Sequence, residues 1–217
     1  MDKILYFSRN PNPRLAVAVA RYLQAPVSLE YASPFAPEHA AKFKALNPTQ
    51  LLPILVEDGH SLWEADAIAC RLSMMVGSNF WRMDQEMPEM IRWISWAKSN
   101  FMMAIDMVHF EYGTKQRYGH GPVDPDKVTE GEALFHSSAA ILNEHLRNRV
   151  HLLDSGLSYA DFRMAAYLPF NDVAGLPVAD YPNIERWYEG LLKLPAWANP
   201  FEGLYAPELP PLPKRTS

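Results

Sequence analysis

Two side chains in the segment 7–23 (FSRNPNPRLAVAVARYL) could take part in chemistry: the hydroxyl of Ser8 and the amide of Asn12. The segment follows a short apolar run and leads into a helical pattern, where an enzyme could place a Cys, Ser or Tyr. The NH₂ group of Asn donates a hydrogen bond at any pH because it does not titrate. Asn also caps helices through its side-chain oxygen, and Asn-Pro pairs are common in turns. Both interpretations of Asn12 are open, because one amide can accept from a helix and donate outward.

Thiol and metal chemistry find little support elsewhere in the chain. Cys70 is the only cysteine, which excludes an intrachain disulfide, a CxxC redox pair and a zinc cage of thiolates. The seven histidines lack metal-ligand spacing; His145 and His151, for example, are six residues apart. Cys70 stands at helical spacing from apolar neighbours, which favours a small buried side chain. We expect no metal.

Composition narrows the class of protein further. The 217 residues are 48% hydrophobic and 21% charged, as is usual for globular proteins. The net charge of −5 is spread along the chain, so a nucleic-acid partner is not expected. No apolar run approaches the roughly 20 residues that a membrane helix needs, and the start MDKILYFS lacks a secretory signal. We therefore expect a cytoplasmic protein without a membrane partner.

The first part of the chain predicts a small α+β domain over residues 1–77. The order is strand, helix, strand, then a hairpin turning at Asp58-Gly59, then a helix, and the first two strands should be parallel with a right-handed crossover. The expected elements are strands at 3–7 and 27–31, helices at 13–24, 38–46 and 64–77, and a hairpin within 53–63.

Residues 78–88 are polar and irregular and are interpreted as a linker, and an all-helical domain is expected over 89–203. Its first helix, 88–113, is apolar on two sides, so both sides must be buried. One side could face the core and the other a ligand pocket or a second subunit. Further helices are expected at 128–148 and 183–194, with a capping box formed by Ser158 and Asp161. The tail 204–217 is proline-rich and expected to be extended.

Three stretches together make the chain resemble the cytosolic glutathione S-transferase family over nearly its whole length. They are NPTQLLPILVEDGHSLWEADAIACRL, LSYADFRMAA and YPNIERWYEGLLKLPAW. The resemblance implies a thioredoxin-like N-terminal domain, an all-helical C-terminal domain and a homodimer. It also implies a cis peptide before Pro53, with the backbone of Leu52 pairing to the cysteinyl part of glutathione like a short added strand.

The resemblance places the other ends of glutathione as well. Glu64 and Ala65 stand where the family has an acidic residue and a Ser that bind the γ-glutamyl end at a helix N-terminus; Ala65 keeps the N–H and lacks the hydroxyl. Gln50 replaces a family Gly near the glycyl end. His39 falls near a position that is often basic and contacts the glycyl carboxylate, although it could equally be exposed to solvent.

In the same alignment Asn12 occupies the position of the catalytic Ser, with Ser8 four residues earlier as the other hydroxyl of the loop. Tyr6 lies within the first strand and is expected to pack there. A glutathione-type thiol has a pKa near 8.5, and lowering it by about two units requires roughly 2.7 kcal/mol, which one hydrogen-bond donor and a helix N-terminus could supply.

These residues predict a glutathione transferase that joins the glutathione thiolate to an apolar electrophile, with glutathione as co-substrate. The electrophile is expected between the sheet domain and the helix 88–113, against Trp96, Met103, Met107, Phe110 and Tyr112. The departures at Asn12, Gln50 and Ala65 keep open a binding or scaffolding module with little catalysis. Isomerase or dehalogenase activity would need the same thiolate, whereas a glutaredoxin-type reductase is disfavoured because the loop has no Cys.

Overall fold

The computed structural model describes residues 3–213, which divide into two compact units. The sheet unit comprises Met1–Met83 and Leu192–Glu208, and the helical unit comprises Asp84–Leu191 and Leu209–Ser217. The last four residues of the expected tail lie outside the described residues. Residues 192–208 group with the sheet unit, whereas the sequence analysis divided them between the helical domain and the tail.

The sheet unit contains a four-stranded sheet in the order β2-β1-β3-β4. The central strand β1 (Lys3–Phe7) pairs in parallel with β2 (Ser28–Tyr31) and antiparallel with β3 (Ile54–Glu57). β3 in turn pairs antiparallel with β4 (His60–Trp63). With the helices between them, these strands confirm the βαβ-ββα order of a thioredoxin-like domain predicted from the sequence.

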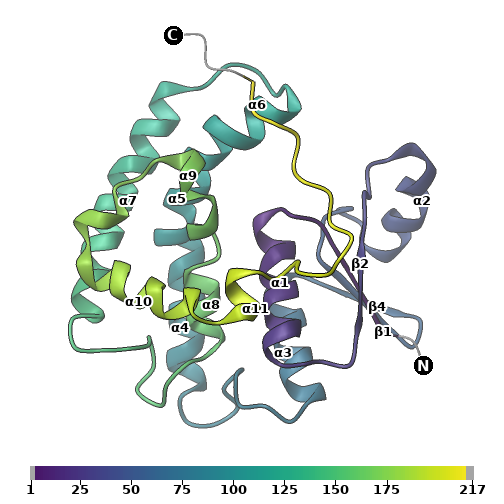
Figure 1. The fold of residues 1–217 in the computed structure, drawn as a ribbon, viewed down its shortest axis with the longest axis horizontal. Coiled ribbons are helices and arrows are strands. Elements are labelled where there is room, and N and C mark those ends of the chain that lie inside the picture. The colour runs from purple at the N-terminus through teal and green to yellow at the C-terminus, as the bar shows by residue number, and fades with distance from the viewer. Residues whose placement is uncertain (1–2, 214–217) are drawn as a thin grey trace. The chain divides into compact units, whose positions relative to one another are not determined.

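After Lys3, strand β1 carries only apolar and aromatic side chains, as expected for a strand covered by helices on both faces of the sheet. Leu5 and Phe7 are fully buried on one face, the side of α1 (Pro11–Tyr22) and α3 (Ala65–Met75), which pack against each other (Figure 1). On the other face lies α2 (Pro37–Leu46), and its Phe43 meets Tyr6 edge to face with ring centroids 5.3 Å apart. The sheet therefore sits between two helical layers.

The hairpin between β3 and β4 turns at the two residues predicted from the sequence. Asp58 has a φ of 52° and Gly59 a φ of 80°. Positive φ at both central residues matches the twist of antiparallel strands, and Asp and Gly tolerate it well. The Asp-Gly pair therefore fixes the register of β3 against β4.

The second chain segment of the sheet unit packs on α1 and on the end of β1. α11 (Pro195–Ala198) lies against α1, with Trp197 fully buried. Beyond it Phe201 stacks on Phe7 with centroids 5.6 Å apart. Residues 192–208 thus complete the core on the α1 side of the sheet.

The helical unit consists of helices and helical turns joined by loops, as predicted. In chain order these are α4 (Met87–Ser99), α5 (Phe101–His109), the π-helical turn η1 (Phe110–Thr114), α6 (Lys115–Tyr118), α7 (Pro125–His145), α8 (Tyr159–Met164), the 3-10 turn η2 (Leu168–Phe170), α9 (Asn171–Ala174), the 3-10 turn η3 (Val178–Asp180) and α10 (Pro182–Leu192). The last residue of α10 belongs to the sheet unit.

The single helix predicted over 88–113 was wrong, because the chain breaks it at Asn100. There φ is −135° and ψ is −98°, well outside the helical region. The Asn100 side-chain amide donates to the carbonyl of Trp96 over 2.9 Å and so satisfies an acceptor at the end of α4. The break separates α4 from α5, and η1 then widens the helix after residue 109.

Two local features hold the helical unit together. Gly131 of α7 lets α5 approach closely, since a Cβ there would lie 2.7 Å from a methyl carbon of Val108. The predicted capping box is confirmed: Ser158 and Asp161 bond each other's backbone at the start of α8. The Asp161 carboxylate also accepts from the backbone of Leu152 at 2.9 Å and from the indole of Trp187 at 3.0 Å, so it ties three segments together.

Candidate functional site

The loop between β1 and α1 carries the side chains singled out in the sequence. α1 begins at Pro11, so Asn10 takes the N-cap position and Asn12 lies in the first turn of the helix. The interpretation of Asn12 as the cap was therefore wrong. The side-chain amide of Asn10 donates to the hydroxyl of Ser8 over 3.2 Å. Asn10 was missed, although the Asn-Pro pair with proline at the first helical position is a recognised start signal.

The helix N-terminus behind this loop is rich in positive potential. In the first turn of α1, Pro11 and Pro13 have no backbone N–H and the Arg14 N–H donates to the Asn10 carbonyl, so the field at the loop comes from the aligned peptide dipoles of the helix. Arg14 lies in the same turn, 7% exposed, and its guanidinium stacks over the Trp197 ring at 4.9 Å and donates to the Trp197 carbonyl. Without an acidic residue in its first turn, α1 presents a field that favours an anion at the loop.

Arg9, between Ser8 and Asn10, is held by the second chain segment of the sheet unit. Its Nε donates to the carbonyl of Ala206 over 2.7 Å, and its Nη2 pairs with Glu208 at 2.8 Å. The guanidinium also lies over the Phe201 ring, 4.9 Å from the centroid. These contacts tie the loop to residues 201–208.

The peptide between Leu52 and Pro53 is cis, as the sequence predicts. Leu52 is half-buried against Tyr6 and Phe43 of the core beneath α2. Gln50 has a φ of 58°, a left-handed conformation that glycine adopts most readily. Its side-chain amide donates to the carbonyls of Pro34 at 3.4 Å and Ala40 at 3.2 Å. The N–H groups of Gln50 thus tie the loop before β3 to the start of α2.

Glu64 and Ala65 form the entry to α3. Glu64 is the N-cap residue, exposed, with φ 73° and ψ 124°, a conformation that costs a non-glycine residue about 1–3 kcal/mol. Ala65, 3% exposed, is the first residue of the helix. Strain of this kind clusters at ligand sites, where the surrounding structure holds it in place. α3 starts at Ala65, and the binding of an anion by the backbone N–H groups there stays a prediction.

The structure also shows how α2 uses its basic residues. His39 is exposed on the first turn of α2. Lys42, one turn further on, donates to the Tyr6 hydroxyl over 3.1 Å and lies over the Tyr6 ring at 4.7 Å. Tyr6 therefore packs beneath α2, as expected, and its hydroxyl is engaged there. Lys42 was missed, although its spacing of three from His39 puts both on one side of the helix.

The residues predicted to contact the electrophile occupy three elements of the helical unit. Trp96 lies on α4 and packs edge to face on Trp93, before the break at Asn100. Met103 and Phe110 are exposed by 39% and 41%, with Met107 half-buried between them. The helix thus brings Met103, Met107 and Phe110 to one outward face. Tyr112 is half-buried in η1.

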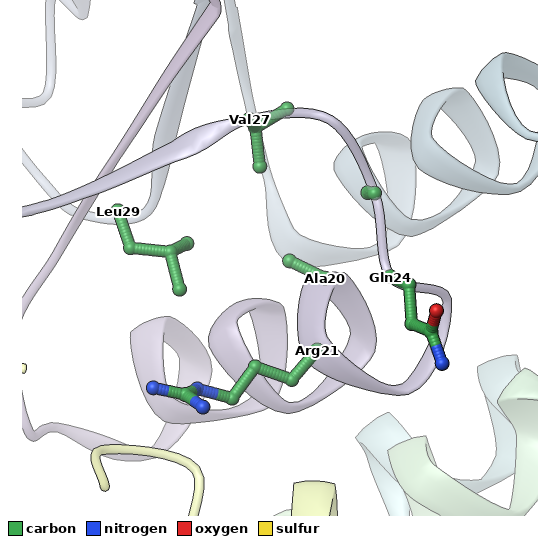
Figure 2. A pocket seen from close by; sticks show the side chains of 6 residues that line it. Ala20, Arg21, Gln24, Val27 and Leu29 are labelled. Atoms are coloured by element: carbon green, nitrogen blue, oxygen red, sulfur yellow. The ribbon is translucent and has the colours of Figure 1, made fainter. Parts of the chain in front are cut away.

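A shallow pocket of about 340 Å³ lies elsewhere in the sheet unit (Figure 2). Its lining comes from the last turns of α1 and from the chain leading into β2: Ala20, Arg21, Gln24, Ala25, Val27 and Leu29. α1 has 12 residues and is about 18 Å long, so the pocket is far from the loop of Ser8 and Asn10 at the other end of the helix. The pocket is not the site predicted from the sequence.

Within residues 3–213 no group of three or more His, Cys, Asp or Glu side chains is placed to hold a metal ion. Burial raises the pKa of the Cys70 thiol, so it stays protonated near neutral pH. In the same part of the chain no helix combines the length and the apolar character needed to cross a bilayer.

Comparisons with known proteins agree with this fold. Residues 2–70 match the N-terminal domain of glutathione S-transferases, and residues 125–190 match their C-terminal domain. Among solved structures, a glutathione S-transferase from Rhodospirillum rubrum F11 is 23% identical, with 96% of each chain covered and a TM-score of 0.81. Glutathione transferase F7 from Populus trichocarpa is 20% identical, with a TM-score of 0.81 over 93% of this chain and 99% of that one.

A third similar structure is Ure2p in complex with glutathione, which is 20% identical. It covers 93% of this chain and 94% of its own, with a TM-score of 0.79. The structural likenesses show the shared fold, and the two domain matches together span more than half of the sequence. The chain belongs to the glutathione S-transferase family.

Proposed function

We propose that this protein is a glutathione transferase that binds glutathione on the sheet unit, keeps its thiol ionised and presents the thiolate to an apolar electrophile. The observation that carries the proposal is the pair of uncharged donors, Ser8 and Asn10, at the N-terminus of α1. Family membership and the glutathione complex of Ure2p support the choice of ligand.

The thiolate is stabilised by the loop between β1 and α1. The Ser8 oxygen already accepts a hydrogen bond from Asn10, so its hydrogen is available for a sulfur anion. A hydrogen bond to a charged group contributes about 1.5–3 kcal/mol, and a helix N-terminus adds about 0.3–1 kcal/mol. Together they match the roughly 2.7 kcal/mol that ionising the thiol near neutral pH requires. Asn12, in the first turn of α1, is the alternative donor.

The rest of glutathione is recognised by three further parts of the sheet unit. The γ-glutamyl carboxylate binds the backbone N–H of Ala65 at the start of α3, and Glu64 receives the amino group. The backbone of Leu52 pairs with the cysteinyl residue. Lys42 supplies positive charge for the glycyl carboxylate, and His39, exposed on the same helix, supplies a ring N–H. The amide of Gln50 is engaged with two backbone carbonyls.

In the reaction the thiolate sulfur forms a bond to an electrophilic carbon, and the leaving group departs with its electron pair. The apolar body of the electrophile binds at Met103 and Met107 on the outward face of α5 and at Phe110 in η1, with Trp96 and Tyr112 nearby in sequence. Holding both reactants in contact supplies most of the rate increase, and the lowered thiol pKa supplies the rest.

A glutathione-binding module with little catalysis is the second candidate. It is favoured by Ala65, which has no hydroxyl for the γ-glutamyl end, and by the engaged amide of Gln50. Such a module would still use the α3 N-terminus and Leu52, but the sulfur would keep its ordinary pKa.

An ultraviolet difference titration with glutathione separates the two, because it follows thiolate absorbance across pH. Saturable binding with a thiol pKa well below 8.5 is expected for the transferase. S-methylglutathione, which has no ionisable thiol, should compete for the site and give no such absorbance. Binding without a pKa shift would establish the module, and no binding would overturn both proposals.

We also propose a cytosolic homodimer, the usual assembly of this family. Sedimentation equilibrium at several protein concentrations checks the assembly, and a single species at the 24.7 kDa mass of one chain would contradict it.

A further inference from the structure

Both chain neighbours of Ser8 contact one part of the sheet unit, residues 201–208, which we call the C-terminal segment. Before Ser8, the Phe7 ring stacks on the Phe201 ring with centroids 5.6 Å apart. After Ser8, the Arg9 guanidinium lies over the Phe201 ring, 4.9 Å from its centroid. The position of Ser8 therefore depends on residues that are far from it in the sequence.

Arg9 makes the most specific of these contacts. Its Nε donates to the carbonyl of Ala206 over 2.7 Å, and its Nη2 pairs with Glu208 at 2.8 Å. The Glu208 side chain is 81% exposed, so water screens the ion pair, and the carbonyl and the ring provide most of the anchoring. A carbonyl at its edge and a ring at its face together orient a planar guanidinium, which a lysine ammonium cannot reproduce.

Arg21, in the last turn of α1, makes a comparable bond to the C-terminal segment. Its Nη2 donates to the carbonyl of Glu202, so this bond too joins a guanidinium to a main-chain acceptor. The 12 residues of α1 span about 18 Å, and only the Arg9 bond lies beside Ser8. The two arginines thus allow a comparison between the same kind of contact near the loop and far from it.

We infer that Arg9 is a positioning residue, which fastens the loop between β1 and α1 to the C-terminal segment and so keeps the Ser8 hydroxyl directed at the glutathione sulfur. A hydrogen bond weakens steeply as it departs from linearity, so a donor on a loose loop stabilises a thiolate less than a fixed one. Residues 8–10 form neither helix nor strand and rely on such side-chain contacts for their order. The inference rests on the proposed function, because it concerns the donor that we assign to the thiolate.

The alternative is a direct effect of the Arg9 charge on the sulfur, and Arg9→Lys separates the two. Lysine keeps the positive charge but loses the bond from Nε and the flat contact with the Phe201 ring. Ultraviolet titration of the glutathione complex measures the thiol pKa. Arg9→Lys is expected to raise it by about half a unit or more, and by less than Ser8→Ala, because the hydroxyl is kept but no longer held. An unchanged thiol pKa in Arg9→Lys would overturn the inference.

Phe201→Leu is the second variant, since it removes the ring beneath the guanidinium without changing any charge. It should raise the thiol pKa as well, and it decides the question if Arg9→Lys does not fold. Arg21→Lys is the matched control, because it alters the bond at the far end of α1, and its thiol pKa should equal that of the wild type. An equal rise in Arg21→Lys and Arg9→Lys would reject a particular role for Arg9.

The wild type shows which of the two proposals fails. If it binds glutathione at the ordinary thiol pKa, or does not bind it, the proposed transferase fails and the inference falls with it. If the wild type lowers the thiol pKa and both Arg9→Lys and Phe201→Leu lower it equally, the inference alone is overturned and the proposed function stands.

Discussion

The side-chain amide of Asn10 donates a hydrogen bond to the hydroxyl oxygen of Ser8 across 3.2 Å. This bond joins the N-cap residue of α1 to the first residue after β1. Because it occupies an oxygen lone pair of Ser8, it turns the hydroxyl hydrogen away from Asn10. The Ser8 hydroxyl is therefore an oriented hydrogen-bond donor, and neither side chain of the pair titrates near neutral pH.

Ser8→Ala should raise the pKa of protein-bound glutathione by one unit or more, because it removes a hydrogen bond worth about 1.5–3 kcal/mol to the thiolate. Asn10→Ala should raise it less, by releasing the Ser8 hydroxyl. Ultraviolet titration of each variant measures the shift. Asn12→Ala tests the alternative donor in the first turn of α1, and a shift in that variant alone would make Asn12 the donor.

Ala65→Ser should tighten glutathione binding by about tenfold or more, because the new hydroxyl can donate to the γ-glutamyl carboxylate at the α3 N-terminus. Isothermal titration of glutathione into both proteins gives the change in Kd. Ala67→Ser, two residues further along α3, should leave Kd unchanged. An equal Kd for Ala65→Ser and the wild type would place the γ-glutamyl end elsewhere.

His109 should make the protein less stable as the pH falls. Burial, followed by the charge of Arg117, lowers the pKa of His109 from 6.5 to about 4. Between these values the unfolded chain binds a proton that the folded chain does not, so stability is lost as pH falls, by up to about 3 kcal/mol. Urea unfolding of the wild type and His109→Leu, at pH values above and within this window, should show a smaller pH dependence in the variant.

His120→Leu is the control for this experiment, because His120 is exposed in the same unit. It should keep the pH dependence of the wild type. An unchanged slope in His109→Leu would mean that other groups account for the loss of stability in acid.

Asp161→Ala should destabilise the helical unit by at least about 3 kcal/mol, because it leaves several buried donors without an acceptor. The carboxylate is fully buried and accepts from the N–H groups of Leu152, Ser158 and Trp187. The urea midpoint measures the loss. Asp154→Ala, at an exposed surface position, should change stability by only about 0.5 kcal/mol. Similar midpoints for both variants would contradict the role given to Asp161.

The sheet and its hairpin could be predicted because their signals are local. Asp58-Gly59 fixes a two-residue turn, and the apolar run of β1 indicates a strand covered on both faces. The capping box at Ser158 and Asp161 is equally local, since its spacing alone defines it. In each case the residues that make the structure are neighbours in the sequence.

The features that could not be predicted depend on contacts between distant residues or on small differences in local energy. The helix α4 ends before Asn100 although the apolar pattern continues across this residue. The break could not be predicted, because hydrophobic periodicity is not sensitive to one residue with a non-helical backbone. The contact of Lys42 with Tyr6 could not be predicted, because it depends on how α2 packs over β1. The helix α1 starts at Pro11, two residues before the predicted start at Pro13. The sequence could not separate the two positions, because both Asn-Pro pairs carry the same start signal.

The sheet unit is completed late in synthesis, because its second segment, residues 192–208, follows the helical stretch 84–191 in the sequence. A ribosome makes β1 to α3 first and then the whole stretch 84–191, and only afterwards the segment that places Trp197 beside Arg14 and Phe201 on Phe7. Until then the nascent chain lacks the contact of Trp197 with Arg14 and the hydrogen bond from Arg9 to the Ala206 carbonyl. The first unit to begin is therefore completed only after the helices of the second have been made.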